Sequence, residues 1–315
     1  MKDGHLPVLV VEVVTMLAPA PGSLQLDATV GGGGHTERIL EATDPDGRLL
    51  GLDADGAAIA RVDRRLRPRF GDRLVLRRAN FRELAVVAPA AGFGAVDGAL
   101  FDLGLSSFQL ADAERGFGIR TGGPLDMRFD PARGVPAAEL LATLDAAELT
   151  ALFRRFGEEP QAARIARAIV DARRTAPLRT AEELVALVER VAPHGPRGRR
   201  RIHPATRVFQ ALRIAVNEEL DALEAGLAAA VDLLRPGGRL VVLSYHSLED
   251  RIVKRFIAAE RRGCTCPPEL PVCVCGRNPR LRLVTHPSLT PSAAEIAANP
   301  RSRSARLRAA ERIAA

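Results

Sequence analysis

Residues 27–36 read DATVGGGGHT, in which four consecutive glycines stand between an apolar run and a histidine. Glycine in series costs backbone entropy and packs no side chain, so another group must approach this backbone closely. The residues 23–30 have the pattern of a buried strand, and a helical pattern begins at about His35. A glycine turn between a strand and a helix directs backbone N–H groups toward a ligand. The stretch therefore predicts a ligand-binding turn in an α/β fold.

Strand patterns alternate with helical patterns after this turn. Apolar runs at 47–55, 73–81 and 95–104 have strand character, and the segment 56–70 has helical character. This alternation predicts βαβ units and a parallel sheet. Residues 105–135 are rich in Gly, Asp and Pro, so a loop is expected there.

The middle of the chain has only helical periodicity, from about residue 136 to 217. Two helix starts in it are marked by capping-box pairs, Asp145 with Glu148 and Thr180 with Glu183. No strand pattern interrupts these helices, which predicts a helical insertion.

The α/β pattern then resumes. A helical segment at 217–234 leads through RPGG into an apolar strand at 239–247. We therefore expect a doubly wound α/β sheet, formed by residues 1–110 and 215–315 and split by a mostly helical insertion at 111–214. A cleft between the two parts is the expected substrate site.

The charge balance is basic, with a formal net charge of +7 and an isoelectric point of about 10.1. Lys2 and Lys254 are the only lysines, and arginines cluster at 197–201 and 301–312. A basic surplus favours a polyanionic partner. However, abundant arginine and alanine are also typical of GC-rich coding, and such clusters are usually solvated faces or flexible tails.

Membrane and secretion signals are not found in the sequence. No apolar run approaches the ~20 residues that a membrane span needs. The N-terminus lacks the pattern of a signal peptide. A cytoplasmic protein without a membrane partner is expected.

All four cysteines, Cys264, Cys266, Cys273 and Cys275, fall within twelve residues. Two close thiol pairs in a cytosolic chain favour a tetrahedral zinc site. The C-x-C spacing is tighter than the usual spacer of zinc sites, so a redox pair or a loop of thiols fits equally well. The sequence leaves both interpretations open.

An acidic residue follows the glycine turn at the distance expected for a nucleoside site. Asp53 ends the second strand, 19 residues after Gly34, where a carboxylate can accept hydrogen bonds from ribose. A dinucleotide site would need a third glycine where this chain has Thr36. Asp27 would repel a pyrophosphate but could hold the ammonium group of S-adenosylmethionine, which carries no phosphate. This methyl donor therefore fits better, with a turn of purely structural glycines as the remaining alternative.

Two further residues stand at strand ends. Asp102 follows the fourth strand, where the ends of neighbouring strands border the ligand crevice of such sheets. Phe81 follows the third strand, where an aromatic ring could cover an adenine. The plainer alternatives are a loop cap for Asp102 and core packing for Phe81.

Distinctive motifs run along nearly the whole chain: DATVGGGGHT, FDLGLSS, GPLDMRFD, RRIHPATRVFQALRIAVNEEL, LSYHSLEDRIVKRF and NPRSRSARLR. With them the chain closely resembles the bacterial S-adenosylmethionine-dependent 16S ribosomal RNA cytosine-N4 methyltransferases. The resemblance implies a Rossmann-like methyltransferase sheet with a helical insertion. It also implies a decoding-region cytidine of 16S rRNA, within the small ribosomal subunit, as methyl acceptor. The chain departs from the family pattern at Phe108, at GFGI (116–119) and at Tyr245, where proline, GFSF and phenylalanine are usual.

The resemblance further implies which residues contact the cofactor. They are Gly33, Gly34, His35, Asp53, Phe81, Asp102 and Gln109.

The chemistry of an exocyclic amine defines the expected catalytic residues. A sulfonium methyl group is already electrophilic, so transfer needs no metal. The amine is a weak nucleophile because its lone pair is delocalised into the ring, so a site that aligns it and accepts its hydrogen bonds promotes transfer. We expect Asp102 and Ser106 or Ser107 in this role, without a dedicated general base.

Side chains after the fifth strand are expected to contact the RNA. Tyr245, the only tyrosine, could stack on a base, and His246 could bond a phosphate or a base edge. The alternative is local, with a helix start at Ser247 and Tyr245 in the core. Further phosphate contacts are expected from arginines, namely Arg120, Arg128, Arg207 and those of 301–308.

Two other functions fit parts of the sequence. Methylation of DNA or of a small amine would use the same donor, but DNA amino-methyltransferases usually carry an Asn/Asp-Pro-Pro-aromatic segment where this chain has DLGLSS. A non-catalytic RNA-binding or ribosome-assembly protein would be expected to lose the glycine turn or Asp53, and both are present. A homodimer is compatible with the sequence, which does not define the oligomeric state.

Overall fold

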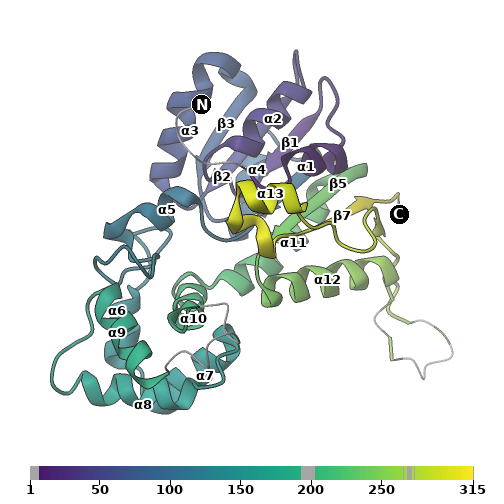
Figure 1. Cartoon of the computed structure of the whole chain (residues 1–315). Coiled ribbons are helices and arrows are strands. Elements are labelled where there is room, and N and C mark those ends of the chain that lie inside the picture. Colours follow the sequence, from purple (N-terminus) through teal and green to yellow (C-terminus); the bar gives the residue numbers. More distant parts are fainter. Residues whose placement is uncertain (1–6, 193–202, 265, 268–271, 273, 315) are drawn as a thin grey trace. The chain divides into compact units, whose positions relative to one another are not determined.

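The computed structural model describes residues 7–192, 203–264, 266–267, 272 and 274–314. The chain divides into two compact units, whose elements are labelled in Figure 1. The sheet unit is Met1–Gly104 with Leu220–Ala315, and the helical unit is Leu105–Glu219. The arginine cluster at 197–201 and Cys273 lie outside the described residues.

The described part of the sheet unit contains a seven-stranded sheet in the order β3-β2-β1-β4-β5-β7-β6. The strands are β1 (Leu24–Asp27), β2 (Arg48–Asp53), β3 (Leu74–Arg78), β4 (Val96–Asp102), β5 (Leu234–Ser244), β6 (Leu281–Leu283) and β7 (Arg306–Arg312). Strands β3, β2, β1, β4 and β5 are parallel, whereas β7 is antiparallel to both of its neighbours. The strand order reverses between β1 and β4, as at the switch point of doubly wound sheets. The predicted Rossmann-like fold class is confirmed.

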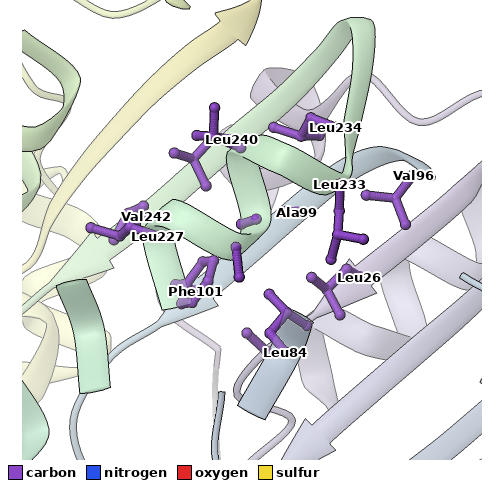
Figure 2. Close-up of a cluster of buried hydrophobic side chains, with 14 of the residues drawn as sticks. Leu26, Leu84, Val96, Ala99, Phe101, Leu227, Leu233, Leu234, Leu240 and Val242 are labelled. Carbon is purple, nitrogen blue, oxygen red and sulfur yellow. The ribbon is translucent and has the colours of Figure 1, made fainter. Parts of the chain in front are cut away.

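Successive side chains of each strand point to opposite faces of the sheet, and both sets include apolar residues. Helices therefore cover both faces. One face packs against α1 (Val10–Leu17), α2 (Gly34–Ala42) and α3 (Gly56–Phe70). The other packs against α4 (Leu84–Ala90), α11 (Glu219–Leu233) and α12 (Ser247–Arg262). Figure 2 shows Leu227 of α11 beside Phe101 of β4 and Val242 of β5. These contacts fix the strand ends from which the candidate site is built.

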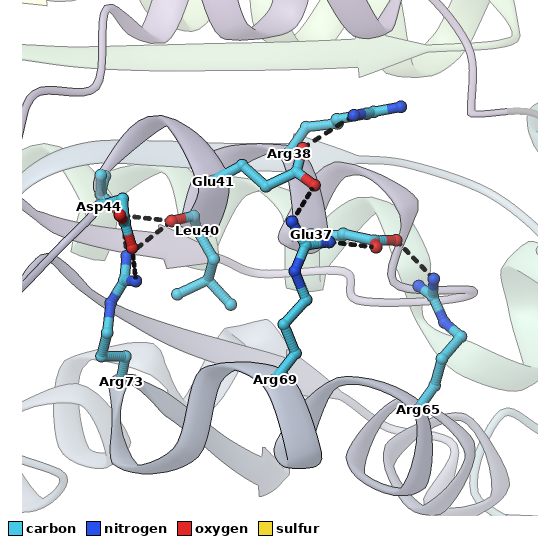
Figure 3. A network of polar contacts seen from close by, with 9 residues as sticks. Glu37, Arg38, Leu40, Glu41, Asp44, Arg65, Arg69 and Arg73 are labelled. Atoms are coloured by element: carbon cyan, nitrogen blue, oxygen red, sulfur yellow. Dashed lines mark hydrogen bonds and ion pairs between the residues drawn. The ribbon is translucent and has the colours of Figure 1, made fainter.

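Surface ion pairs tie α2 to α3, as Figure 3 shows. Arg69 of α3 binds Glu37 at 3.1 Å and Glu41 at 2.7 Å, and Arg65 also pairs with Glu37. Each exposed pair contributes at most about 1 kcal/mol. Together they hold the start of α2, which carries the glycine turn, against its neighbouring helix.

The C-terminal arginine cluster contains a sheet strand, β7, and is therefore not a flexible tail, although Arg301, Arg303 and Arg306 are exposed as on a solvated face. Strand β7 lies between β5 and β6 and buries Leu307, Ala309 and Ala310 completely. Arg308 alternates with these residues and binds both carboxylate oxygens of Asp250, at 2.8 and 3.1 Å. The period-2 alternation of small apolar residues with arginine explains the strand.

The strand boundaries also differ from those expected. Strand β5 begins at Leu234, which lies opposite Val96. The register then shifts, and regular pairing resumes with Gly98 opposite Arg239. It ends at Ser244, before the residues 245–247 that the sequence assigned to it.

The helical unit has its own apolar core, formed mainly by α6 (Ala137–Thr143), α7 (Ala146–Gly157), α8 (Ala162–Ala172), α9 (Ala181–Val191) and α10 (Ala205–Asn217). The predicted capping boxes are confirmed at the starts of α7 and α9. The helical unit begins at Leu105, whereas the predicted insertion began at residue 111. Leu105 and Leu110 pack against the core of this unit. Among the described residues, no helix has the length and apolarity that a membrane crossing requires.

The segment 105–135 contains short helices as well as loop. They are α5 (Ser107–Ala111) and a 3₁₀ turn at Ala113–Arg115. The loop beyond them is fixed by Asn217, which accepts from the Phe129 N–H and donates to the Met127 carbonyl, both at 2.7 Å. Arg115 donates to the Arg128 and Phe129 carbonyls at 2.7 and 2.9 Å.

Candidate active site

Three aspartates end neighbouring parallel strands of the sheet unit. Asp27 ends β1, Asp53 ends β2 and Asp102 ends β4. The carboxyl ends of parallel strands lie at one edge of a sheet, and ligands of doubly wound folds bind outside that edge. The fold therefore gathers the three predicted acidic residues at the candidate site.

The glycine turn joins β1 to α2 in a conformation that suits glycine. Gly33 caps α2 with φ +76°. A Cβ atom at Gly33 would lie 2.9 Å from both Val62 and Arg65 of α3, and one at Gly34 would lie 3.0 Å from Pro7. The groups that approach the glycine backbone closely therefore include side chains of the protein itself. The turn brings the N-terminus of α2 to the edge where the strands end.

Asp27 fixes both ends of this turn. Its Oδ1 accepts from the Thr29 N–H at 3.1 Å, and its Oδ2 accepts from the Thr36 hydroxyl at 2.6 Å. Burial raises the pKa of Asp27, although the Thr36 hydrogen bond lowers it. Thr36 occupies the position where a dinucleotide fingerprint has glycine, so this departure has a structural role. The Asp27 side chain is buried within the turn rather than open toward a ligand.

Asp53 lies beside the turn and binds its first glycine. Its Oδ2 accepts from the Gly31 N–H at 2.9 Å, and its Oδ1 accepts from the Asp55 N–H at 2.8 Å. Burial raises the pKa of Asp53 to about 6, despite these hydrogen bonds, which lower it. Each carboxylate oxygen has a second lone pair with which it could accept a bond from ribose.

Asp102 connects three distant parts of the chain. Its backbone N–H donates to the Thr29 hydroxyl at 2.6 Å. Its Oδ1 accepts from the Tyr245 hydroxyl at 2.7 Å, and its Oδ2 lies 3.4 Å from His35 Nδ1. The Asp102 side chain remains 23% exposed, so it can still be reached by a ligand. We call Asp102, His35, Tyr245 and Thr29 the Asp102 network.

His35 is nearly buried and held from both sides. Its Nε2 lies 2.9 Å from the Val8 carbonyl, opposite the nitrogen that faces Asp102. Burial opposes protonation, but the hydrogen bond and charge of Asp102 outweigh it and raise the pKa of His35. With both ring nitrogens engaged, His35 fixes the orientation of Asp102 relative to the start of α2.

Tyr245 and His246 form the start of α12. Burial, followed by the charge of Asp102, raises the pKa of Tyr245 well above its ordinary value, so its hydroxyl stays protonated and donates. The Tyr245 N–H donates to Glu249 at 2.8 Å. His246 is the N-cap of α12, and its Nε2 lies 3.0 Å from Glu249 Oε1. Both residues thus lie at a helix start, as the alternative interpretation of this segment expected. Their contact with RNA stays a prediction.

Phe81 packs within the core of the sheet unit. Its ring meets Phe101 edge to face, with centroids 5.7 Å apart. The side chain remains partly exposed. Core packing therefore accounts for its position, and cover of an adenine stays a prediction.

Ser106 and Gln109 belong to the helical unit, where they cap α5. The Ser106 hydroxyl accepts from the Gln109 N–H at 3.2 Å, and the Gln109 side-chain oxygen accepts from the Ser106 N–H at 3.0 Å. This reciprocal capping box is a sufficient local reason for both residues. Their predicted catalytic and cofactor contacts stay predictions.

Two of the predicted arginine contacts, Arg128 and Arg207, are engaged within the helical unit. Arg128 binds both carboxylate oxygens of Asp126, at 2.7 and 2.8 Å, and this pairing raises the pKa of Arg128. Arg207 donates to the Glu158 carbonyl at 3.2 Å and is partly exposed. Arg120 is exposed. Contact of Arg128 or Arg207 with RNA stays a prediction.

The sequence analysis missed the partners that hold the site together. They are Thr29, Thr36, Val8 and Glu249. Thr36 had a usable signal, because it replaces a fingerprint glycine. Glu249 also had a local signal, because it lies three residues after the helix-capping position of His246. Thr29 and Val8 had none, since each meets its residue only after the chain has folded.

The site presents carboxylate oxygens beside a helix N-terminus and backbone N–H groups. Gly32 of the turn accepts from Arg65 of α3 at 3.0 Å through its carbonyl. This arginine also pairs with Glu37. Negatively charged carboxylate oxygens that accept hydrogen bonds suit a cationic ligand with hydroxyl groups better than a polyphosphate. Two carboxylates at adjacent strand ends could hold a sugar and orient an amine.

Comparison with known proteins places the whole chain in context. A family model described as the MraW methylase family matches residues 2–313. Ribosomal RNA small subunit methyltransferase H of Thermomicrobium roseum is 60% identical over 314 residues, covering 100% of this chain and 95% of that protein. The protein of the same name from Symbiobacterium thermophilum is 50% identical over 315 residues, covering 100% and 98%.

Solved structures are similar at a lower level. An rRNA methylase from Streptococcus thermophilus has a TM-score of 0.46 and 10% identity, covering 98% of this chain and 99% of that one. This likeness is too low to carry a functional argument.

Proposed function

The chain belongs to the MraW methylase family, and from that premise we propose that it methylates the exocyclic N4 amine of a cytidine in the decoding region of 16S ribosomal RNA. The relatives named above are ribosomal RNA small subunit methyltransferases. The choice of cytidine N4 rests on the motif resemblance and on the carboxylate at the end of β4. We place the reaction in the cytoplasm, on RNA within the small ribosomal subunit.

S-adenosylmethionine is the methyl donor. When bound, it supplies an electrophilic methyl group that the amine takes up as one amine proton is lost and S-adenosylhomocysteine is released. Asp53 would hold the ribose hydroxyls, and the turn of Gly33, Gly34 and His35 would hold the amino-acid end. Phe81 and Gln109 are further proposed contacts of the cofactor. The carboxylate of Asp53 fits this role because its oxygens retain lone pairs beside Gly31.

The Asp102 network is the observation that carries the proposal. The Asp102 carboxylate lies beside His35 of the glycine turn and accepts from Tyr245, which follows β5. The Asp102 backbone N–H also donates to Thr29 of the turn. A carboxylate held in this way can accept a hydrogen bond from an amine and orient its lone pair. Orientation can supply ~7–11 kcal/mol of a barrier in favourable cases. After transfer the amine is a stronger acid and can lose its proton to water.

The helical unit is assigned the recognition of RNA. It carries the partly exposed Arg207 and the exposed Arg120, and the whole chain is basic. Phosphate contacts of this kind give affinity that falls as salt rises. An unpaired cytidine in an RNA loop would enter the site at a smaller cost than a stacked base. Tyr245 and His246 are the proposed contacts of the substrate on the sheet unit.

The proposal is tested by transfer of labelled methyl from S-adenosylmethionine to unmodified acceptors. Small ribosomal subunits, free 16S rRNA and double-stranded DNA are supplied separately, and the labelled nucleoside is identified by mass spectrometry. We expect N4-methylcytidine from the ribosomal RNA and no product from DNA. Label in DNA, or in a ribosomal nucleoside other than N4-methylcytidine, would contradict the proposed acceptor.

A further inference from the structure

Three cysteine side chains converge in the loop that joins α12 to β6. The Sγ atoms of Cys264, Cys266 and Cys275 all lie within 4.8 Å of one another. These residues take no part in the candidate active site. We propose that they bind a zinc ion as thiolates, with a further ligand completing the tetrahedron.

The spacing of the sulfur atoms matches this coordination. Zinc binds thiolate sulfur at about 2.3 Å in tetrahedral sites, which places two ligating sulfurs about 3.8 Å apart. Cys264 Sγ and Cys275 Sγ lie 3.8 Å apart. A disulfide would require about 2.05 Å. The two sulfurs are therefore at the separation of metal ligands and not of a covalent pair.

A backbone hydrogen bond holds the sulfur atom of Cys266 in place. The Val274 N–H donates to Cys266 Sγ at 3.3 Å. Hydrogen bonds to ligand atoms orient them and tune their basicity in metal sites.

The base of the loop is fixed, so the cysteines are held by the fold. Gly263 ends α12 with φ +68°, and a Cβ atom there would lie 2.4 Å from the Asn278 and Pro279 backbone. Arg280 then returns to α12, where its N–H donates to the Glu260 carbonyl at 2.8 Å and its guanidinium pairs with Glu260. Both ends of the loop meet at this point.

The described part of the loop has an irregular backbone. It contains no helix or strand between Gly263 and Leu281, and Val272 and Val274 are 69% and 77% exposed. A loop of this length without an apolar core usually needs another source of order. Zinc bound to three thiolates would supply it, since metal binding by a loop is coupled to its folding.

The test is the metal content of the untagged full-length chain, purified without chelator and measured by inductively coupled plasma mass spectrometry. We expect about one zinc per chain. Replacement of zinc by Co²⁺ is expected to give the strong visible absorption of tetrahedral cobalt thiolate. Removal of the metal is expected to speed tryptic cleavage after Arg277, which is already exposed, because the loop around it loses order. This readout does not depend on methyl transfer.

Two variants make the test specific. The double substitution Cys264→Ser and Cys275→Ser is expected to lower the zinc content at least tenfold and abolish the cobalt spectrum. The matched control Val272→Ser changes an exposed residue of the same loop and should retain the metal. Circular dichroism of both variants would show that the rest of the fold is intact.

Three results would overturn the proposal. Zinc below about 0.1 per chain in the unmodified protein would remove the site. A disulfide, counted by thiol titration before and after reduction, would replace it with a redox pair. Iron with inorganic sulfide, seen as visible absorption of the purified protein, would assign the thiolates to a cluster instead of zinc.

Discussion

Asp102 and Ser106 lie four positions apart in the sequence, yet their side chains are held in opposite ways. Asp102 binds Tyr245, which is 143 residues away along the chain, and lies beside His35 of the glycine turn. The Ser106 hydroxyl accepts from the N–H of Gln109, three residues away, and the Ser106 N–H donates to the Gln109 side chain. The first arrangement needs the whole sheet unit, whereas the second needs a single helical turn.

This difference separates two meanings of a polar residue after a strand. A local cap satisfies backbone groups at a helix start and contributes about 1 kcal/mol to folding. A carboxylate gathered from distant segments, and still partly exposed, has no such local reason. We therefore propose that Asp102 orients the methyl acceptor, and we expect any catalytic contribution of Ser106 to be smaller than that of Asp102.

The largest effect is expected from Asp102→Asn, which keeps the size of the side chain and removes its charge. Loss of the negative acceptor would disturb both the amine and the contacts with His35 and Tyr245. We expect kcat for methyl transfer to fall about 100-fold, with a smaller change in donor affinity. Steady-state kinetics with labelled donor measures both.

The matched control lies on the same strand. Asp97 binds the Leu24 N–H and Arg235 near the opposite end of β4. Asp97→Asn should retain methyl transfer within about threefold of the parent, because Asp97 lies away from the site. It should lower stability only slightly, since exposed ion pairs contribute little. Equal losses in the two variants would remove the distinction between the two ends.

The next largest effect is expected from Asp53→Asn on binding of S-adenosylmethionine. Removing the charged acceptor of the ribose hydroxyls should weaken the Kd about tenfold, corresponding to one charge-assisted hydrogen bond. Isothermal titration calorimetry checks this change. Asp63→Asn, which removes an exposed charge from α3, should leave the Kd unchanged.

The same carboxyl predicts a pH dependence. Because the pKa of Asp53 is raised to about 6, the ionised form is lost as pH falls through 6. If the ionised form binds ribose, about one site in ten remains ionised at pH 5, and the Kd should rise about tenfold relative to pH 7.5. A pH-independent Kd for the parent protein would contradict this role, and Asp53→Asn should abolish the dependence on this group.

A smaller effect is expected from Tyr245→Phe. This change removes the hydroxyl that donates to Asp102 and keeps the ring that could stack on a base. We expect kcat to fall about tenfold while the KM for RNA changes little, since a hydrogen bond to a charged group is lost. Tyr245→Leu should raise the KM as well. A change in KM alone for Tyr245→Phe would favour direct RNA contact by the hydroxyl.

The smallest catalytic effect is expected from Ser106→Ala. The change removes the N-cap of α5 and should lower the free energy of unfolding by about 1 kcal/mol. Methyl transfer should remain within about threefold of the parent. Denaturant unfolding and kinetics of the same preparation measure both quantities. A loss of activity comparable with Asp102→Asn would place Ser106 in the catalytic site after all.

Much of the fold and part of the site could be predicted from sequence because their signals are local. The apolar runs and the glycine turn indicated the parallel sheet, and Asp53 and Asp102 stand directly at strand ends. The Tyr245–Asp102 hydrogen bond could not be predicted, because it joins segments that only the strand order brings together. Sequence spacing carries no information about such a contact.

Strand β7 shows a second limit. Its alternation of arginine with small apolar residues resembles a solvated tail when the chain is considered alone. Burial follows only from pairing with β5 and from Asp250, which accepts from Arg308. A strand that carries charged side chains on its exposed positions cannot be predicted from its composition alone, because its stability depends on the strands it pairs with.

The most direct test of the account is a crystal structure of the full chain with S-adenosylhomocysteine. The account predicts the ribose hydroxyls within hydrogen-bond distance of Asp53 and the amino-acid end at the glycine turn, with Asp102 facing the sulfur side. A ligand bound away from the ends of β1, β2 and β4, or one whose ribose does not contact Asp53, would contradict it.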